Sequence, residues 1–146
     1  RTALVACAEP PEAIASACDE AIVLRTGPEV VTGSTRMKAG TATKMVLNMI
    51  TTGAMIRLGK TYGNLMVDLQ ATNAKRRDRG ERIVREVARV DRESARAAIT
   101  AAGGSVRTAI VMVATNATRE EAERLLTHHR YRLRPILGDP PPVEDA

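Results

Sequence analysis

The residues best suited to bind a small anion lie in a short hydroxyl-rich and basic stretch, residues 27–38. The candidates are hydroxyl, glycine and basic residues: Thr32, Gly33, Ser34, Thr35, Arg36 and Lys38. A helical pattern follows, with Met45 and Met49 on one side. The first N–H groups of a helix lack intrahelical partners and carry partial positive charge, so a phosphate or carboxylate can bind there. Basic residues in a first turn oppose the helix dipole, and either an anionic ligand or a structural carboxylate would explain them.

The helix after this loop is expected to run from about residue 35 to residue 58, with Ser34 or Thr35 as its cap. Gly40 and Gly53 interrupt it, and each weakens a helix by nearly 1 kcal/mol relative to alanine. Interior glycines often allow another backbone to approach, so they indicate a packed interface, between subunits or within one.

A strand, a short helix and a second strand precede the loop and must position it. The apolar residues 2–8 predict a buried strand, residues 12–17 a helix with Ile14 and Ala17 facing inward, and residues 21–24 the next strand. This spacing is typical of a parallel α/β unit, whose ligands bind outside the carboxyl ends of the strands. The loop begins directly after the second strand, where a ligand is expected.

The second half of the chain predicts a small helical bundle. Residues 60–70 are expected to be extended around a turn at 63–64. Asp68 is either a buried carboxylate or, more simply, the partner of an arginine or the cap of a neighbouring segment. Start and stop signals then predict helices beginning at Thr72 or Asn73, Asp91, Ser105 and Thr118, and ending near 88, 101, 114 and 128. The charge run 75–79 is a solvated helix face or a segment that reaches a substrate of a neighbouring subunit.

Composition limits the classes of partner. The chain has no Trp and no Phe, so its core must be aliphatic, and its net charge of +5 suits an acidic ligand. Aromatic interleaving, zinc-ligand spacing and a recognition helix are lacking, which argues against nucleic acid. Cys7 and Cys18 lack metal-binding spacing and fit the reducing cytoplasm. The adjacent His128 and His129 point to different sides of a helix, which argues against a shared metal or catalytic role. No apolar run is long enough to span a membrane.

Two longer strings carry a family resemblance. GPEVVTGSTRMKAGTATKMVLN, residues 27–48, resembles the signature of the N-acetylmuramic acid 6-phosphate etherases and the related glucokinase regulatory proteins. These are sugar-isomerase (SIS) domain proteins that bind phosphosugars. MIRLGKTYGNLMVD, residues 55–68, is similar to the continuation of the bacterial etherases. The resemblance extends to about Leu137.

The resemblance implies an α/β fold in three parts. Residues 1–72 would be the C-terminal half of a SIS domain, a flavodoxin-like parallel α/β sandwich that forms homodimers. Residues 73–137 would be a helical cap, a three-helix bundle similar to a ubiquitin-associated (UBA) domain, and residues 138–146 a disordered tail. Because the chain starts without Met and inside an apparent strand, we expect a piece of a longer protein.

The resemblance also implies a lyase that cleaves the D-lactyl ether of N-acetylmuramic acid 6-phosphate without metal or organic cofactor. The family's two catalytic glutamates lie in the first half of the SIS domain, so we expect no catalytic residue here and no activity of this chain alone. Glu29 is a surface or capping carboxylate, or else it accepts from a sugar hydroxyl or orients Arg36 or Lys38. A non-catalytic phosphosugar-binding regulator and a dimerisation piece are the alternative functions.

Overall fold

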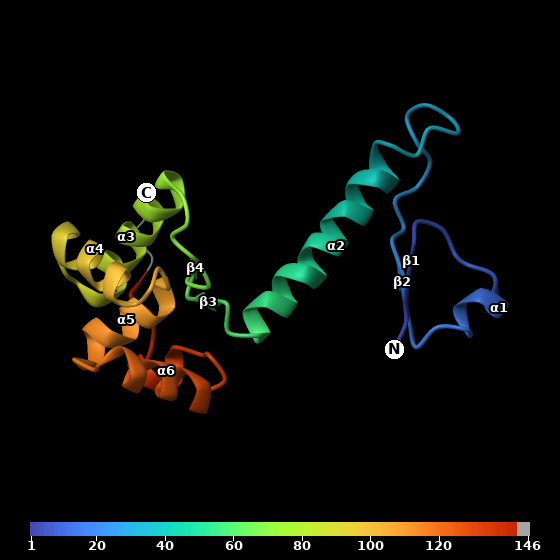
Figure 1. Cartoon of the computed structure of the whole chain (residues 1–146). Helices are drawn as coiled ribbons and strands as arrows, with labels where there is room; N and C mark the ends of the chain where they lie inside the picture. The colour runs from blue at the N-terminus through green and yellow to red at the C-terminus, as the bar shows by residue number, and fades with distance from the viewer. Residues whose placement is uncertain (143–146) are drawn as a thin grey trace. The chain divides into compact units, whose positions relative to one another are not determined.

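The computed structural model describes residues 1–142 and divides into two compact units, Arg1–Gly53 and Ala54–Ala146 (Figure 1). The border lies inside a helix, whereas the domain boundary expected from the family resemblance falls at residues 72 and 73 and stays a prediction. The first unit contains β1 (Ala3–Ala6), α1 (Glu12–Ala15), β2 (Glu20–Val23) and most of α2 (Lys38–Arg57). The second contains β3 (Thr61–Tyr62), β4 (Leu65–Met66), α3 (Ala74–Ala88), α4 (Arg92–Ala101), α5 (Val106–Thr115), α6 (Arg119–His128) and α7 (Arg134–Leu137).

The first unit is built on the parallel pair that the sequence predicted. β1 and β2 pair in parallel, with Ala3 opposite Glu20 and Ala6 opposite Val23, and α1 is the crossover between them. The pairing continues past β2, because the Leu24 amide donates to the Ala6 carbonyl at 2.7 Å. The protein is therefore a mixed α/β protein with a small parallel sheet.

The expected burial of this pair was wrong. No residue of β1 or β2 is fully buried. Ile14 and Ala17 were expected to face inward, but Ile14 is 51% exposed and Ala17 is also exposed. The reason is that α1 has only one turn, so it offers too little surface to cover the two strands. Strand pairing needs only backbone hydrogen bonds, whereas burial needs a second layer.

α2 is a long helix whose apolar side chains lie in solvent within the part of the chain that the structure describes. None of its residues is buried, and Met45, Leu47 and Met49 are 59%, 50% and 69% exposed. A methyl group built on Gly53 would meet no atom within 4 Å, so the close backbone approach expected there is not found in residues 1–142. Gly40 is different, since its Cβ would lie 3.2 Å from the Thr35 carbonyl oxygen.

The helical unit begins its helices at the residues that the sequence indicated. The side chain of Asn73 caps α3, Asp91 caps α4 and Ser105 caps α5. Thr118 and Glu121 form the expected capping box of α6. The glycine pair after α4 has left-handed φ values of 64° and 88°, which ends that helix. These predictions are confirmed because each depends on groups only three residues apart.

The core of this unit is aliphatic, as expected, except for Tyr62, which is 5% exposed. Ile110, Leu126 and Leu133 are at most 2% exposed. The helices α3, α4, α5 and α6 pack together (Figure 1). α3 comes close to α5 at Gly80, where a Cβ would lie only 2.8 Å from Cγ2 of Val106. The helices of the predicted bundle are therefore present, while its likeness to a UBA domain stays a prediction.

Before α3, β3 and β4 form a hairpin around the expected turn at Gly63. Asp68, which follows it, is not buried, because its side chain is 42% exposed. It pairs with Arg107 at 2.6 Å and with Lys60 at 2.9 Å, so the expected arginine partner is confirmed.

The tail expected to be disordered is described only in part. The Tyr62 hydroxyl donates to the carbonyls of Gly138 and Asp139 at 3.2 and 3.0 Å, so the first tail residues lie against the hairpin. Residues 143–146 lie outside the described residues. Through residue 142, no helix combines the length and the apolar character that crossing a membrane requires.

Candidate functional site

The hydroxyl-rich loop lies beside the carboxyl end of the parallel pair. Cys7 follows β1, and its thiol donates to the Ala39 carbonyl at 3.6 Å and lies 3.4 Å from the Thr43 hydroxyl. These contacts hold the first turns of α2 next to the end of β1. The loop from Gly27 to Met37 connects β2 to this point, which is the side of a parallel α/β unit where ligands bind.

Glu29 caps α2. One of its carboxylate oxygens accepts from the Lys38 amide at 3.1 Å and the other from the Ala39 amide at 3.0 Å. These hydrogen bonds, that to Ala39 foremost, lower the pKa of the Glu29 carboxyl below its usual value. The Lys38 ammonium donates to the Pro28 carbonyl at 3.0 Å and so ties the same loop to the helix.

The expected capping by Ser34 or Thr35, and a helix start near Thr35, were therefore wrong: α2 starts at Lys38. A carboxylate satisfies two amides at once and also carries the charge that the helix dipole favours, which a single hydroxyl cannot do. Of the roles open for Glu29, the structure confirms the capping one. Its ionised oxygens keep further lone pairs, so the cap does not exhaust its capacity as an acceptor.

The first amides of α2 are all used within the protein. Lys38 and Ala39 donate to Glu29, the Gly40 amide to the Thr35 carbonyl at 2.9 Å, and the Thr41 amide to the Met37 carbonyl at 3.1 Å. The sequence suggested that an anion would bind free N–H groups at the start of this helix. These groups already have partners within the protein. The basic residues of the first turn are explained in part by the structural carboxylate.

The loop side chains themselves are available. Through residue 142, the hydroxyls of Thr32, Ser34 and Thr35 make no hydrogen bond, and Arg36 forms no ion pair. Gly33 has a left-handed φ of 81°, which reverses the chain between the hydroxyl residues. Thr32, Thr35 and Arg36 are exposed and Ser34 is half-buried. These groups, rather than the helix amides, are the polar groups of the loop that remain accessible.

The pH dependence of the cap is a direct test of its geometry. Because the folded pKa of Glu29 is lowered, its contribution is complete above the unfolded value of about 4.3 and is lost as pH falls through the folded value. We expect hydrogen-exchange protection of the Lys38 and Ala39 amides, corrected for intrinsic exchange, to decrease as the pH is lowered below about 4.3. In Glu29→Gln, protection should be lower at neutral pH and insensitive to acid. Equal protection of these two amides in the wild type and in Glu29→Gln at neutral pH would contradict the capping role.

Sequence reasoning missed a second polar cluster, in the helical unit. Glu81 is nearly buried on the side of α3 that also carries Ile83 and Val84, and its carboxylate accepts from Arg92 and Arg96 of α4. A carboxylate among the apolar positions of an amphipathic helix was the available signal, because such a group requires charged partners. The run 75–79 is exposed, as a solvated face should be. Among the described residues, no three His, Cys, Asp or Glu side chains gather in a way that could hold a metal ion.

Comparison with known proteins shows that this mixed α/β chain is similar, over most of its own length, to proteins named N-acetylmuramic acid 6-phosphate etherase. No family model matches it. It is 52% identical to the N-acetylmuramic acid 6-phosphate etherase of Photobacterium profundum over 93% of this chain and 46% of that protein. The Klebsiella aerogenes etherase is 51% identical over 94% of the chain and 45% of that protein, and the Mycolicibacterium smegmatis etherase is 52% identical over 82% and 40%.

The chain belongs to the N-acetylmuramic acid 6-phosphate etherase family, of which it corresponds to the C-terminal portion. It spans less than half of the length of the curated relatives that it matches.

Proposed function

We propose that this chain is part of an N-acetylmuramic acid 6-phosphate etherase. It would supply one wall of the phosphosugar site and also the helical cap of the enzyme. The observation that supports this most strongly is the identity of about half of all residues over nearly the whole chain to proteins of that name. The same names favour the etherase over a non-catalytic phosphosugar-binding regulator.

The complete enzyme would be a carbon–oxygen lyase. A base removes the proton at C2 of the amino sugar, and an acid protonates the ether oxygen at C3, so that the C3–O bond breaks and D-lactate leaves. Water then adds across the C2–C3 double bond to give N-acetylglucosamine 6-phosphate. Two carboxyl groups with different pKa values suit these roles, and we assign them to residues outside this chain.

Within this chain we assign phosphosugar binding to the loop residues that the sequence singled out: Thr32, Gly33, Ser34, Thr35, Arg36 and Lys38. The hydroxyls bind phosphate oxygens, Arg36 supplies charge, and Lys38 holds the loop through the Pro28 carbonyl. Glu29 positions the loop by capping α2, and its remaining lone pairs accept from a sugar hydroxyl.

The finer fold and the compartment belong to the same proposal. Residues 1–72 form the C-terminal half of a flavodoxin-like SIS domain, and residues 73–137 a UBA-like cap. Cys7 and Cys18 are free thiols, which suits a reducing cytoplasm. No metal or organic cofactor is required by the elimination.

We also propose that two copies associate through the first unit, with the apolar side chains of α2 at the contact. Met45 and Met49 lie one turn apart on the same side of α2 and are 59% and 69% exposed in the described chain, which is costly for a solvated helix. We expect sedimentation of the chain to give a dimer, and Met49→Lys to give a monomer with unchanged helicity. A monomeric wild type would contradict this contact.

The assignment of the loop is tested in the full-length enzyme. We expect Ser34→Ala and Arg36→Gln each to raise KM by about 10–100-fold, because each removes a charge-assisted hydrogen bond to phosphate. Arg57→Gln is the control for net charge. Arg57 lies in the last turn of α2, far along the chain from the loop, so this variant should leave KM unchanged. Equal effects of all three variants would contradict a local phosphate site.

The 146-residue chain alone should show no turnover of N-acetylmuramic acid 6-phosphate, while N-acetylglucosamine 6-phosphate should shift the amide resonances of residues 32–38. Turnover by the chain alone would show that the acid and base lie within it and would overturn the assignment of those groups to another segment.

A further inference from the structure

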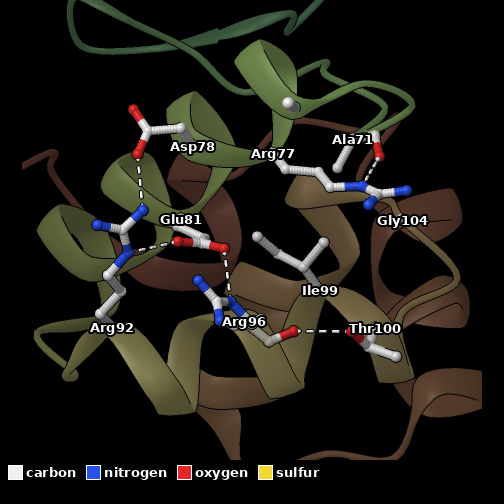
Figure 2. Close-up of a pocket in the computed structure, with 10 residues that line it drawn as sticks. Ala71, Arg77, Asp78, Glu81, Arg92, Arg96, Ile99, Thr100 and Gly104 are labelled. Carbon is white, nitrogen blue, oxygen red and sulfur yellow. Dashed lines mark hydrogen bonds and ion pairs between the residues drawn. The ribbon is translucent and has the colours of Figure 1, made fainter.

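A groove in the helical unit has no part in the function proposed above. It has a volume of about 700 Å³ and lies between α3, α4 and the turn that follows α4. Ala71, Ala74, Ile99 and Gly104 contribute its apolar surface. Arg77, from α3, and Arg92 and Arg96, from α4, stand around it (Figure 2). Its volume is within the range of small-molecule sites, about 300–1,000 Å³.

The arginines of α4 are held in place by a carboxylate beneath them. The Glu81 side chain is only 8% exposed, and its two oxygens accept from Nε of Arg92 at 2.7 Å and from Nε of Arg96 at 2.9 Å. Arg96 and then Arg92 lower the pKa of the Glu81 carboxyl, so it stays ionised at neutral pH. Figure 2 shows both guanidinium groups joined to this carboxylate. Their orientation is therefore fixed before any ligand arrives, which reduces the entropy lost on binding.

Anchoring through Nε leaves the outer ends of two guanidinium groups free. The structure gives Arg96 no partner for its two terminal amino groups in the described chain, and its side chain is 66% exposed. Arg77 is arranged similarly, since its Nε donates to the Ala71 carbonyl at 3.3 Å and it forms no ion pair through residue 142. A pair of terminal amino groups is the fork that binds a carboxylate or phosphate through two parallel hydrogen bonds.

The charges of the groove do not cancel. Arg77, Arg92 and Arg96 face Glu81 and Asp78, so one positive charge remains. Asp78 is occupied by Arg92, whose Nη2 donates to it at 2.8 Å. Glu81 is shared between Arg92 and Arg96, so the excess charge resides at Arg77 and Arg96. In Figure 2 the side chain of Ile99 lies between these two arginines.

We propose that this groove binds a small organic molecule with an oxyanion group, phosphate or carboxylate, at each end: one group is held by Arg96, the other by Arg77, and the apolar body lies on Ile99 between them. A purely structural ion-pair cluster would need Arg92, Arg96 and Glu81 to join α3 to α4, but it would not need Arg77. The apolar floor also distinguishes the groove from a solvated basic face, which offers charge without a surface for the body of a ligand.

The test uses the whole 146-residue chain and two probes that separate the possible anions, terephthalate and hydroquinone bisphosphate, at constant ionic strength. We expect saturable shifts of the amide resonances of residues 71–78 and 96–104 with at least one probe, and weaker binding of benzoate, which carries only one anionic group. Arg77→Gln and Arg96→Gln should each weaken binding about tenfold, the loss expected for one bidentate contact.

Arg79→Gln is the matched control, because Arg79 is exposed on the same helix and does not line the groove. Equal weakening by Arg79→Gln would mean general attraction by a basic face and would overturn the proposal. So would the absence of saturation by both probes. Arg77→Gln keeps the test decisive if Arg96→Gln disturbs the packing of α3 on α4, because Arg77 has no ion-pair role there.

Discussion

Replacing Ile110 with alanine is expected to destabilise the helical unit by about 2–5 kcal/mol, the usual cost of truncating a fully buried aliphatic side chain. Ile110 is 0% exposed in the middle of α5, a helix that contacts α3, α4 and α6. The core contains no Phe or Trp that could move into the space left behind. The cavity would therefore remain, and its cost adds to the lost transfer free energy.

Urea unfolding followed by the helical circular dichroism signal measures this effect. Ile14→Ala is the control, because Ile14 is 51% exposed and the same atoms are removed there without opening a cavity. The control should change the free energy of unfolding by less than about 0.5 kcal/mol. Similar losses in the two variants would show that Ile110 is not in a packed core. Ile110→Val should lower the free energy of unfolding by about 0.5–1.5 kcal/mol, between the losses of Ile14→Ala and Ile110→Ala.

Local signals predicted the helical unit well. Asn73, Asp91, Ser105 and Thr118 begin their helices because each side chain reaches an amide three residues ahead, a relation that is visible in the sequence. The parallel pairing of β1 with β2 was predictable for a similar reason, since the spacing between them allows a crossover. None of these features depends on residues distant in the chain.

The errors arose where a distant group competes with a local one. Glu29 reaches the α2 amides from nine and ten residues away and excludes the nearer hydroxyls of Ser34 and Thr35 from the cap. The pairing of Glu81 with Arg92 and Arg96 joins two helices, so the sequence of α3 shows a carboxylate among apolar positions but does not show its partners. Gly80, rather than Gly53, is where another helix comes close to a glycine. Whether a glycine is needed depends on the residue that faces it across the interface, which its own helix does not reveal.

These errors change the candidate site more than the fold. The loop residues remain those that the sequence singled out, but the positive helix end is already filled by a carboxylate of the protein. The phosphate binding that we propose for this loop therefore depends on side-chain hydroxyls and Arg36. This makes the loop more sensitive to Ser34→Ala than a site built on backbone amides, which no side-chain substitution removes.

Removing the Asp68 carboxylate should leave a buried guanidinium group without its anion. Arg107 is 8% exposed; its Nη2 pairs with Asp68 at 2.6 Å and its Nη1 donates to the Tyr131 carbonyl at 3.1 Å. Its Nε is buried without a hydrogen-bond partner in the described residues. Because Asp68 is itself 42% exposed, solvent replaces part of the lost interaction. We therefore expect Asp68→Ala to destabilise the helical unit by about 1–3 kcal/mol.

Arg107→Met is the informative second variant. It removes the charge and the unpartnered Nε together while retaining an unbranched side chain against Tyr131, whose ring centre lies 5.5 Å from the guanidinium carbon. Deleting one partner of a buried ion pair costs more than replacing the buried charge with an apolar group, so Arg107→Met should be less destabilising than Asp68→Ala. Asp78→Ala, which removes an exposed carboxylate from the same unit, should cost least. If urea unfolding instead shows that Asp68→Ala and Asp78→Ala lower the free energy of unfolding equally, then Arg107 is solvated in solution. In that case the burial of the Arg107 side chain at the start of α5 would be contradicted.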